Sequence, residues 1–321
     1  MPSPTFGRPH APLSGTPRTP GPLFSHRDFS ARRLAAAKAG LGLTTSLCIP
    51  ARDEERTIGA IVASARRHLV EAVPLLDEIL VLDDGSTDGT AAVAREAGAR
   101  VLCGAGVLPE AGPGSGKGDA IWKSLAASRG DLVCWVDGDI SDFGSRFVVG
   151  LLGPLLTDPG VAFVKGFYHR PGGGSATGGG RVTELAARPL LSLLFPALAA
   201  VVQPLAGEYA GRRPLLESLP VTQGWGVDLA LVLDVAATAG LPALAQVDLG
   251  TRRHRHRPLE ELAPQAMAVM VAALRRAGVA EADVVRLVRF DGTHGRLEVT
   301  VETSERPPLA SLREPAGELS A

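Results

Sequence analysis

Two short apolar segments that each end in a pair of carboxylates constrain the fold of this chain more than any other feature. Residues 132–136 have the β-branched and aromatic content of a buried strand, and Asp137 and Asp139 follow them. Residues 79–82 form a similar run that ends in two further acids. In an extended segment, side chains two residues apart point to the same side, and open α/β sheets bind ligands beyond the carboxyl ends of their strands. The pattern therefore predicts acidic groups gathered at one edge of a sheet, although an Asp-x-Asp tripeptide alone also fits an ordinary polar turn.

The rest of the chain alternates between strand-like and helix-like segments. Apolar residues recur at helical spacing after the first predicted strand, and the same succession continues along the chain. Such alternation is typical of a mostly parallel sheet with helices on both faces. A hairpin is predicted around Asp291 and Gly292, and an extended return segment within residues 207–219. The expected strands are residues 44–49, 79–82, 101–103, 132–136, 161–168 and 244–249, and the expected helices are residues 53–69, 89–97, 117–128, 143–156, 225–239 and 259–277.

One domain is expected between two tails. Residues 1–30 are rich in proline and poor in periodic apolar residues, so we expect a disordered N-terminal tail there and a C-terminal tail at residues 306–321. No linker-like stretch separates residues 31–170 from residues 171–305, which we expect to be two halves of the same domain. The longest apolar run, residues 190–202, contains a proline and is too short to span a bilayer. It predicts a buried or dimer-interface helix and no stable membrane insertion.

Composition argues against several classes of partner. The net charge of −1 provides no general attraction to nucleic acid or to anionic membranes. The cysteines are scattered without metal-binding spacing, which is typical of a cytoplasmic protein in a reducing compartment. Few of the 33 basic residues are lysines, so Lys117 in a glycine-rich loop is a candidate ligand contact. The loop is not a phosphate-binding P-loop, because Ala111 and Gly118 stand where that motif requires glycine and serine or threonine.

The remaining polar groups suit a metal-assisted reaction of an anionic ligand. Carboxylate oxygens at a strand end favour Mg²⁺, with Mn²⁺ as the second choice. Asp84, at the other strand end, can accept a hydrogen bond from a ribose or a pyrimidine N–H, or it can simply shape its turn. The basic run at residues 252–257 fits a compact diphosphate better than nucleic acid, because no aromatic residues interleave it. His254 within that run is a candidate metal ligand.

The chain resembles glycosyltransferases of the GT-A, family-2-like type. The resemblance lies in residues 49–55, 82–88 and 136–139, which read IPARDEE, LDDGSTD and VDGD. The second half carries four segments that resemble the glucosyl-3-phosphoglycerate synthases of actinobacteria, at residues 178–190, 203–211, 224–228 and 254–258. The resemblance implies a GT-A, Rossmann-like, mostly parallel sheet with helices on both faces. It also implies a C-terminal extension for acceptor binding and dimerisation.

By the same resemblance, the activity is a retaining, Mg²⁺-dependent transfer of glucose from UDP-glucose to the 2-hydroxyl of 3-phosphoglycerate by a homodimer. Asp139 and His254 would hold the metal, and Gly180, Arg181 and Thr183 would hold the acceptor. The donor-binding residues would be Pro50, Ala51, Arg52, Glu54, Asp84, Lys117, Asp137, Gly138 and Asp228. The groups at the reaction centre would be Asp137, Asp139, the backbone carbonyl of Leu205, Asp228 and Arg252.

Asp228 departs from the resembled pattern, in which a glutamate is expected at this position. A carboxylate that is one methylene shorter changes its reach toward the sugar, so the identity of the hexose stays open. Mannosyl-3-phosphoglycerate synthesis from a GDP- or UDP-sugar is the nearer alternative. A membrane-associated transferase to polyprenyl phosphate and a non-catalytic protein that binds sugar nucleotides are the more distant ones.

Overall fold

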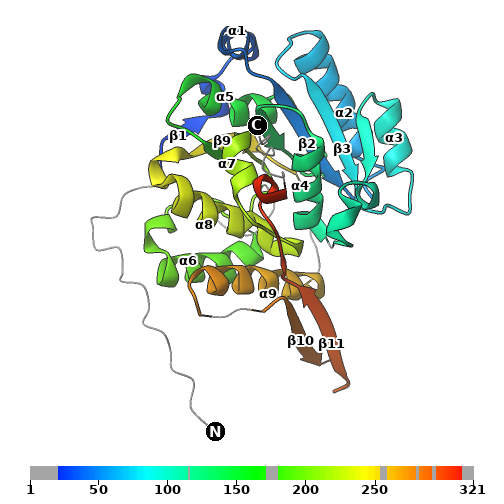
Figure 1. Ribbon diagram of the computed structural model, residues 1–321, viewed down its shortest axis with the longest axis vertical. Coiled ribbons are helices and arrows are strands. Elements are labelled where there is room, and N and C mark those ends of the chain that lie inside the picture. Colours follow the sequence, from blue (N-terminus) through cyan, green and yellow to red (C-terminus); the bar gives the residue numbers. More distant parts are fainter. Residues whose placement is uncertain are drawn as a thin grey trace, which may run out of the picture.

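An eight-stranded sheet runs through the protein in a computed structural model that describes residues 21–114, 116–170, 180–253, 259–279, 282–290 and 294–312 (Figure 1). The strand order is β1-β9-β6-β7-β5-β2-β3-β4, and every neighbouring pair is parallel except the two that involve β7. The mostly parallel sheet predicted from the sequence is therefore confirmed. The strands are β1 (Leu23–Ser25), β2 (Thr45–Ala51), β3 (Glu78–Asp83), β4 (Arg100–Cys103), β5 (Leu132–Trp135), β6 (Phe163–His169), β7 (Tyr209–Arg212) and β9 (Leu244–Thr251).

Two apolar cores cover the two faces of the sheet, because successive residues of a strand point to opposite sides. In β2, Leu47 and Ile49 lie in one core together with residues of α1, α2 and α5, whereas Cys48 lies in the other core with residues of α4, α6, α8 and α9. All three side chains are fully buried. The helices are α1 (Ala31–Leu41), α2 (Ile58–Arg66), α3 (Thr90–Glu96), α4 (Gly116–Ala127), α5 (Arg146–Thr157), α6 (Arg188–Leu194), α7 (Arg213–Ser218), α8 (Val227–Ala239) and α9 (Leu259–Arg276).

Within this sheet, β7 alone runs against its neighbours, and it lies between β5 and β6. Trp135 at the end of β5 pairs with Tyr209 at the start of β7, and their ring centroids are 5.5 Å apart. The segment that leads into β7 therefore arrives beside the carboxyl end of β5. This arrangement brings Gly207 and Glu208 from the second half next to the Asp137 turn. The predicted return segment is confirmed for β7, and the residues after it form the short helix α7.

Parts of both expected tails belong to the folded domain. In residues 21–30, β1 pairs in parallel with β9 at the edge of the sheet, so the expectation of disorder up to residue 30 is wrong for these residues. At the other end, β12 (Glu305–Arg306) pairs with β8 (Val221–Thr222), and Leu309 is buried. A strand of two or three residues has no detectable periodicity of its own, and only its pairing partner stabilises it.

Two predicted helices are shorter than expected. The helix expected from residue 53 begins at Ile58, because Asp53 has a left-handed φ of 56° and its carboxylate accepts a hydrogen bond from the Thr87 N–H at 2.7 Å. The apolar run at residues 190–202 supplies only the end of α6, because Phe195, the residue before Pro196, leaves the helical conformation with a φ of −137° and a ψ of 59°. In the part of the chain that the structure describes, no helix combines the length and the apolar character needed to cross a membrane.

The chain ends in an extension built around the predicted hairpin. β10 (Val284–Phe290) and β11 (Arg296–Glu302) pair antiparallel, which confirms the predicted hairpin, although its expected turn residues Asp291 and Gly292 lie outside the described residues. The hairpin projects from the body of the protein beside α9 (Figure 1). After it, the chain returns to the main body through β12.

Candidate active site

A cavity of about 680 Å³ lies at the carboxyl ends of β2, β3 and β5. Residues that the sequence analysis assigned to a donor, an acceptor and a reaction centre line it together, although they come from both halves of the chain. They are Pro50, Ala51, Arg52, Glu54, Asp84, Lys117, Asp137, Gly138, Asp139, Gly180, Arg181, Thr183, Leu205, Asp228 and Arg252. The remaining candidate, His254, lies outside the described residues.

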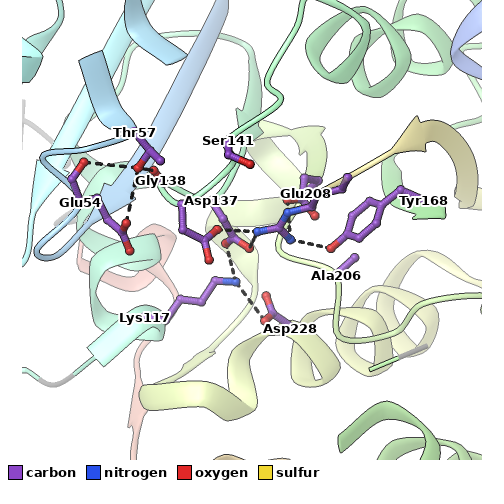
Figure 2. Close-up of polar contacts among 12 residues, drawn as sticks. Glu54, Thr57, Lys117, Asp137, Gly138, Ser141, Tyr168, Ala206, Glu208 and Asp228 are labelled. Carbon is purple, nitrogen blue, oxygen red and sulfur yellow. Dashed lines mark hydrogen bonds and ion pairs between the residues drawn. The ribbon is translucent and has the colours of Figure 1, made fainter. Parts of the chain in front are cut away.

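The turn of Asp137, Gly138 and Asp139 follows β5 directly and is held from two sides. Thr57 Oγ1 donates a hydrogen bond to the Gly138 carbonyl oxygen at 2.6 Å (Figure 2). On the other side, a Cβ atom added to Gly207 would lie 2.1 Å from Asp137 Oδ1. Glycine at position 207 therefore leaves the space that the Asp137 carboxylate occupies.

Arg252, which follows β9, joins the two carboxylates of this turn. Its Nη2 atom donates to Asp137 Oδ2 at 3.0 Å and to Asp139 Oδ1 at 2.6 Å. Its Nη1 atom donates to the Tyr168 hydroxyl at 2.6 Å and lies 3.0 Å from Glu208 Oε1. Burial would lower the pKa of Arg252, but the surrounding acids outweigh it and hold this pKa well above its usual value. A permanent positive charge is thus fixed beside the strand-end carboxylates.

Lys117, in the first turn of α4, connects carboxylates from both halves of the chain. Its Nζ atom lies 2.9 Å from Asp137 Oδ1 and 3.1 Å from Asp228 Oδ2 (Figure 2). Burial opposes the charged form of each group, but mutual attraction holds the pKa of Lys117 well above and that of Asp137 well below its usual value. For Asp228, burial is the larger influence and the pKa is raised. Asp137 is therefore ionised at neutral pH and is a poor proton acceptor.

Glu208 lies behind Arg252 and is fully buried. Burial raises the pKa of Glu208 to about 7, although the positive charge of Arg252 acts in the opposite direction. The carboxyl group does not touch the cavity, so we interpret it as a group that holds the guanidinium in place. The guanidinium also stacks on Tyr168, with its carbon 5.2 Å from the ring centroid.

The ends of β2 and β3 form another part of the cavity. The backbone N–H of Asp84 donates to the Ala51 carbonyl oxygen at 2.9 Å, which holds the two strand ends together. The backbone N–H of Glu54 donates to Thr90 Oγ1 at 2.7 Å. Burial raises the pKa of Asp84 to about 6, against the opposing charge of Arg52. This side chain is therefore a hydrogen-bond acceptor that changes its charge just below neutral pH.

Gly180, Arg181 and Thr183 line the cavity at the start of the segment that leads into α6. The Gly180 carbonyl oxygen accepts a hydrogen bond from the Glu184 N–H at 3.0 Å, and the Thr183 side chain is buried. Arg170, at the end of β6, lies beside them, since a Cβ atom on Gly180 would be 2.8 Å from its Nη1 atom. Two guanidinium groups and a hydroxyl in one cavity wall suit a small anion with two charged ends.

The donor set at the Asp137 turn fits a divalent cation only in part. Asp137 and Asp139 both line the cavity with hard carboxylate oxygens, which suit Mg²⁺ or Mn²⁺ when substrate phosphates complete the coordination. Among the described residues, no group of three or more His, Cys, Asp or Glu side chains is placed to hold an ion. His254 is outside the described residues, so its assignment as a ligand stays a prediction.

Sequence patterns missed several residues of this site. Arg170 follows β6, so applying the strand-end rule to that strand as well would have found it. Tyr168 and Glu208 hold Arg252, and their roles depend on contacts with a distant part of the chain. Trp225 and three residues of α9, namely Leu262, Gln265 and Val269, also line the cavity. Their apolar or neutral side chains carry no signal that separates them from ordinary packing residues.

Comparison with known proteins identifies the family. Residues 46–192 match glycosyl transferase family 2. The glucosyl-3-phosphoglycerate synthase of Mycolicibacterium smegmatis is 48% identical over 287 residues, which cover 87% of this chain and 93% of the relative. Among solved structures, the chain is similar to glucosyl-3-phosphoglycerate synthase from Mycobacterium tuberculosis, crystallised in complex with Mn²⁺, UDP-glucose and phosphoglyceric acid. The sequences are 44% identical, the TM-score is 0.83, and the match covers 92% of this chain and 100% of that one. The 40% identical crystal structure of mannosyl-3-phosphoglycerate synthase from Rubrobacter xylanophilus also has a TM-score of 0.83 and covers 91% of this chain and 96% of that one.

These matches extend over both halves of the chain and confirm the GT-A-type fold that the sequence predicted. The resemblance of the second half to a particular group of glycosyltransferases is confirmed as well. The chain belongs to the glucosyl-3-phosphoglycerate synthases, within glycosyl transferase family 2.

Proposed function

We propose that this chain transfers glucose from UDP-glucose to the 2-hydroxyl of 3-phosphoglycerate, with retention of configuration. One observation carries the proposal: a single cavity gathers strand-end carboxylates, buried cations and an arginine-rich wall from both halves of the chain. The relatives that share this fold include a synthase crystallised with UDP-glucose and phosphoglyceric acid. The enzyme is a metal-dependent glucosyltransferase.

The donor would lie along the edge formed by β2, β3 and β5. Asp84 would accept from the uracil N3–H, and Pro50, Ala51, Arg52 and Glu54 would surround the base. Lys117 and Asp137 line the cavity between this end and the sugar, and their ion pair would open to admit the nucleotide. This end of the cavity would suit a pyrimidine base better than a purine base.

The diphosphate would lie against the Asp137 turn and Arg252. We assign Asp139 as the carboxylate ligand of the metal, with His254 as a second ligand implied by the family resemblance. When bound, a divalent ion neutralises diphosphate charge and makes UDP a better leaving group. Arg252, held by Glu208 and Tyr168, opposes the negative charge that grows on the leaving diphosphate.

The acceptor would be held at Gly180, Arg181 and Thr183, with Arg170 beside them. The planar guanidinium of Arg181 matches a phosphate or a carboxylate, and a glycine at position 180 lets an anion approach the backbone. Because the low pKa of Asp137 keeps it ionised, we assign the acceptor's proton to the leaving diphosphate and not to this carboxylate. Attack then occurs on the face that the diphosphate leaves, near the Leu205 carbonyl and Asp228.

We further propose a cytoplasmic homodimer. The free thiols of Cys48, Cys103 and Cys134 suit a reducing compartment, and both proposed substrates are phosphorylated metabolites. Leu193 in α6 and Phe290 in the hairpin are large apolar side chains that are 79% and 67% exposed, and a second copy of the chain that packed on α6 and the hairpin would cover them. Light scattering on the purified protein tests the dimer, and a single monomeric species over a wide concentration range would contradict it.

A matrix of nucleotide sugars and three-carbon acids tests the reaction. UDP-glucose, GDP-glucose, UDP-mannose and GDP-mannose are each offered with 3-phosphoglycerate, 2-phosphoglycerate and glycerate in the presence of Mg²⁺. We expect the highest kcat/KM for UDP-glucose with 3-phosphoglycerate. The mannosyl alternative is kept because of the match to the Rubrobacter xylanophilus enzyme and because of Asp228. A higher kcat/KM for GDP-mannose would establish that alternative instead.

A further inference from the structure

Arg306, near the C-terminal end of the described chain, contacts the loop that leads into the donor cavity. This Lys117 loop, residues 109–117, precedes and begins α4, and Ser115 within it lies outside the described residues. After the hairpin, the chain runs back toward α4 (Figure 1). There β12 pairs with β8, which places Arg306 beside the start of α4. A residue expected to begin a tail therefore lies within the main body of the protein.

The guanidinium of Arg306 makes three polar contacts with this region. Its Nε atom donates to Asp119 Oδ1 at 2.7 Å, and the Asp119 side chain is almost completely buried. Its Nη1 and Nη2 atoms donate to the carbonyl oxygens of Ala111 and Gly112, at 2.5 Å and 3.0 Å. The group also lies over the Trp122 ring, 5.2 Å from its centroid. One side chain thus connects two residues of the loop with two residues of the helix that follows it.

The packing around the loop leaves little room for an alternative path. A Cβ atom on Gly114 would lie 2.0 Å from the Asp119 carboxylate, which Arg306 and Lys123 hold in place. A Cβ atom on Gly118 would lie 1.9 Å from the Thr222 carbonyl oxygen in β8. Because β8 pairs with β12, the strand that carries Arg306 also sets the surface against which α4 begins.

We propose that Arg306 is a positioning residue of the donor site, which holds the Lys117 loop in the conformation that binds UDP-glucose. The inference rests on the proposed function, because it takes the Lys117 end of the cavity as the place of the nucleotide. Arg306 is not among the residues that line the cavity. Its effect reaches the donor through Ala111, Gly112 and Asp119. The C-terminal extension, which follows the second half of the chain, would thereby help to shape the donor site.

The physical reason is the geometry of the guanidinium. Its planar group of five donors reaches a carboxylate and two carbonyl oxygens at once, whereas a lysine ammonium at the same place is a single point charge. Without Arg306, two partly buried carbonyl groups and one carboxylate oxygen lose their partner, so the loop is expected to move to regain hydrogen bonds. A shift of about 1 Å in a group that orients substrate is enough to cost up to about 10²-fold in reactivity.

The test compares Arg306→Met with Arg213→Met. Arg213 is a matched control, because it is also largely buried and binds the opposite end of α4 by donating to the Leu125 carbonyl oxygen and Ser128 Oγ at 3.0 Å and 2.9 Å. Arg306→Met is expected to raise the KM for UDP-glucose and the Kd for UDP by about tenfold, while the KM for 3-phosphoglycerate changes less than about twofold. Both variants are expected to lower the melting temperature by similar amounts, because each removes a buried guanidinium. Arg213→Met should nevertheless leave both KM values within about twofold of wild type.

Two further variants keep the test decisive if Arg306→Met does not fold. Arg306→Lys retains the contact with Asp119 and should show a smaller rise in donor KM. Gly114→Ala leaves residue 306 as arginine and should raise the same KM by displacing the Asp119 carboxylate that Arg306 binds. Wild-type donor binding in all the Arg306 and Gly114 variants that fold, or an equal donor defect in Arg213→Met, would overturn the proposal. Calorimetry with UDP needs no acceptor and no turnover. Failure of wild-type turnover therefore counts against the proposed function, and an unchanged Kd for UDP in the variants counts against the role of Arg306.

Discussion

The two halves of this protein build their parts of one cavity in different ways. Between residues 45 and 170, regular parallel strands end in the polar groups that line the site, as Asp84 and Asp137 do. Between residues 180 and 253, the residues that line the cavity come from the segment before α6, from Leu205, from the start of α8 and from the position that follows β9. Their positions are set by buried ion pairs and hydrogen bonds, of which the Arg252 contacts with Glu208 and Tyr168 are the clearest.

The difference shows how well regular secondary structure alone can position a functional side chain. A strand-end carboxylate depends mainly on the direction of its strand, so a change there should alter chemistry and spare the fold. A buried cation of the second half, such as Arg252, depends on partners up to 115 residues away, so its removal should also affect structure. The three changes below, ordered by the size of the expected effect, alter groups that line the cavity, and the first two are paired with control variants of groups that serve the fold.

Asp139→Ala should have the largest effect. If Asp139 is the metal ligand, removing it should lower kcat/KM by roughly 10²-fold or more, because the charge of the diphosphate is no longer neutralised. The melting temperature should stay close to that of wild type, since the Asp139 side chain is at a strand end and partly exposed. Steady-state kinetics over a range of Mg²⁺ concentrations measures the effect, and near-normal Mg²⁺-dependent turnover would rule out the assignment.

Asp131→Ala is the matched control for that experiment. Asp131 precedes the same strand, β5, at the end away from the cavity, and its carboxylate accepts from the Thr44 N–H at 2.8 Å and the Thr44 hydroxyl at 2.7 Å. The loss of these bonds should cost about 1 kcal/mol in the free energy of unfolding and change kcat/KM by less than about twofold. The pair of variants separates chemistry from stability within one strand.

Arg181→Ala should have the next largest effect, and it acts on the acceptor. The loss of a charge-assisted contact worth about 1.5–3 kcal/mol predicts a rise of roughly 10- to 100-fold in the KM for 3-phosphoglycerate, with UDP-glucose binding unchanged. Arg181→Lys should be impaired as well, because a point charge does not match the planar fork.

Arg188→Ala serves as the control for the acceptor variants. Arg188 belongs to the same segment but donates to Glu184 Oε1 and the Val202 carbonyl oxygen, at 3.0 Å and 2.6 Å. It should lower stability and leave the KM for 3-phosphoglycerate unchanged. If Arg181→Ala weakened UDP binding and kept its acceptor response, the wall at Gly180, Arg181 and Thr183 would belong to the donor.

Asp84→Asn should have the smallest effect. It should raise the stability of the fold and weaken the binding of UDP. Because the pKa of Asp84 is raised from 3.8 to about 6 in the folded chain, its ionisation costs stability, and this cost is absent below about pH 3.8 and complete above about pH 6. The variant should therefore melt at a higher temperature than wild type at neutral pH, and this advantage should disappear in acid. UDP binding should weaken a few-fold, because an amide accepts a hydrogen bond less strongly than a carboxylate does.

The pH dependence of UDP binding provides a second readout for Asp84. The ratio of the Kd of the variant to that of wild type cancels the titration of UDP itself. This ratio should shrink as pH falls below about 6, where wild-type Asp84 gains its proton. A ratio that is constant across this range would show that Asp84 does not contact the base.

Residue spacing alone was enough to predict most of the first half and the hairpin of the second half. The alternation of strands and helices, the strand-end positions of Asp84 and Asp137, and the hairpin at β10 and β11 all follow from patterns that span fewer than twenty residues. Such patterns work because side-chain direction in a strand or helix repeats with a fixed period. The likeness to family motifs added second-half residues such as Leu205 and Asp228, which residue spacing did not assign to the site, whereas the basic run at residues 252–257 had already pointed to Arg252.

Only the tertiary structure decided how these parts meet. The insertion of β7 between β5 and β6 brings Gly207 against Asp137, and the return of the chain after the hairpin brings Arg306 to the start of α4. The sequence separations are 115 residues for the Arg252 contact with Asp137 and 187 residues for the Arg306 contact with Asp119. No local period encodes such pairs. These pairs are present in the folded chain because a buried guanidinium without carboxylate or carbonyl partners would be costly in free energy.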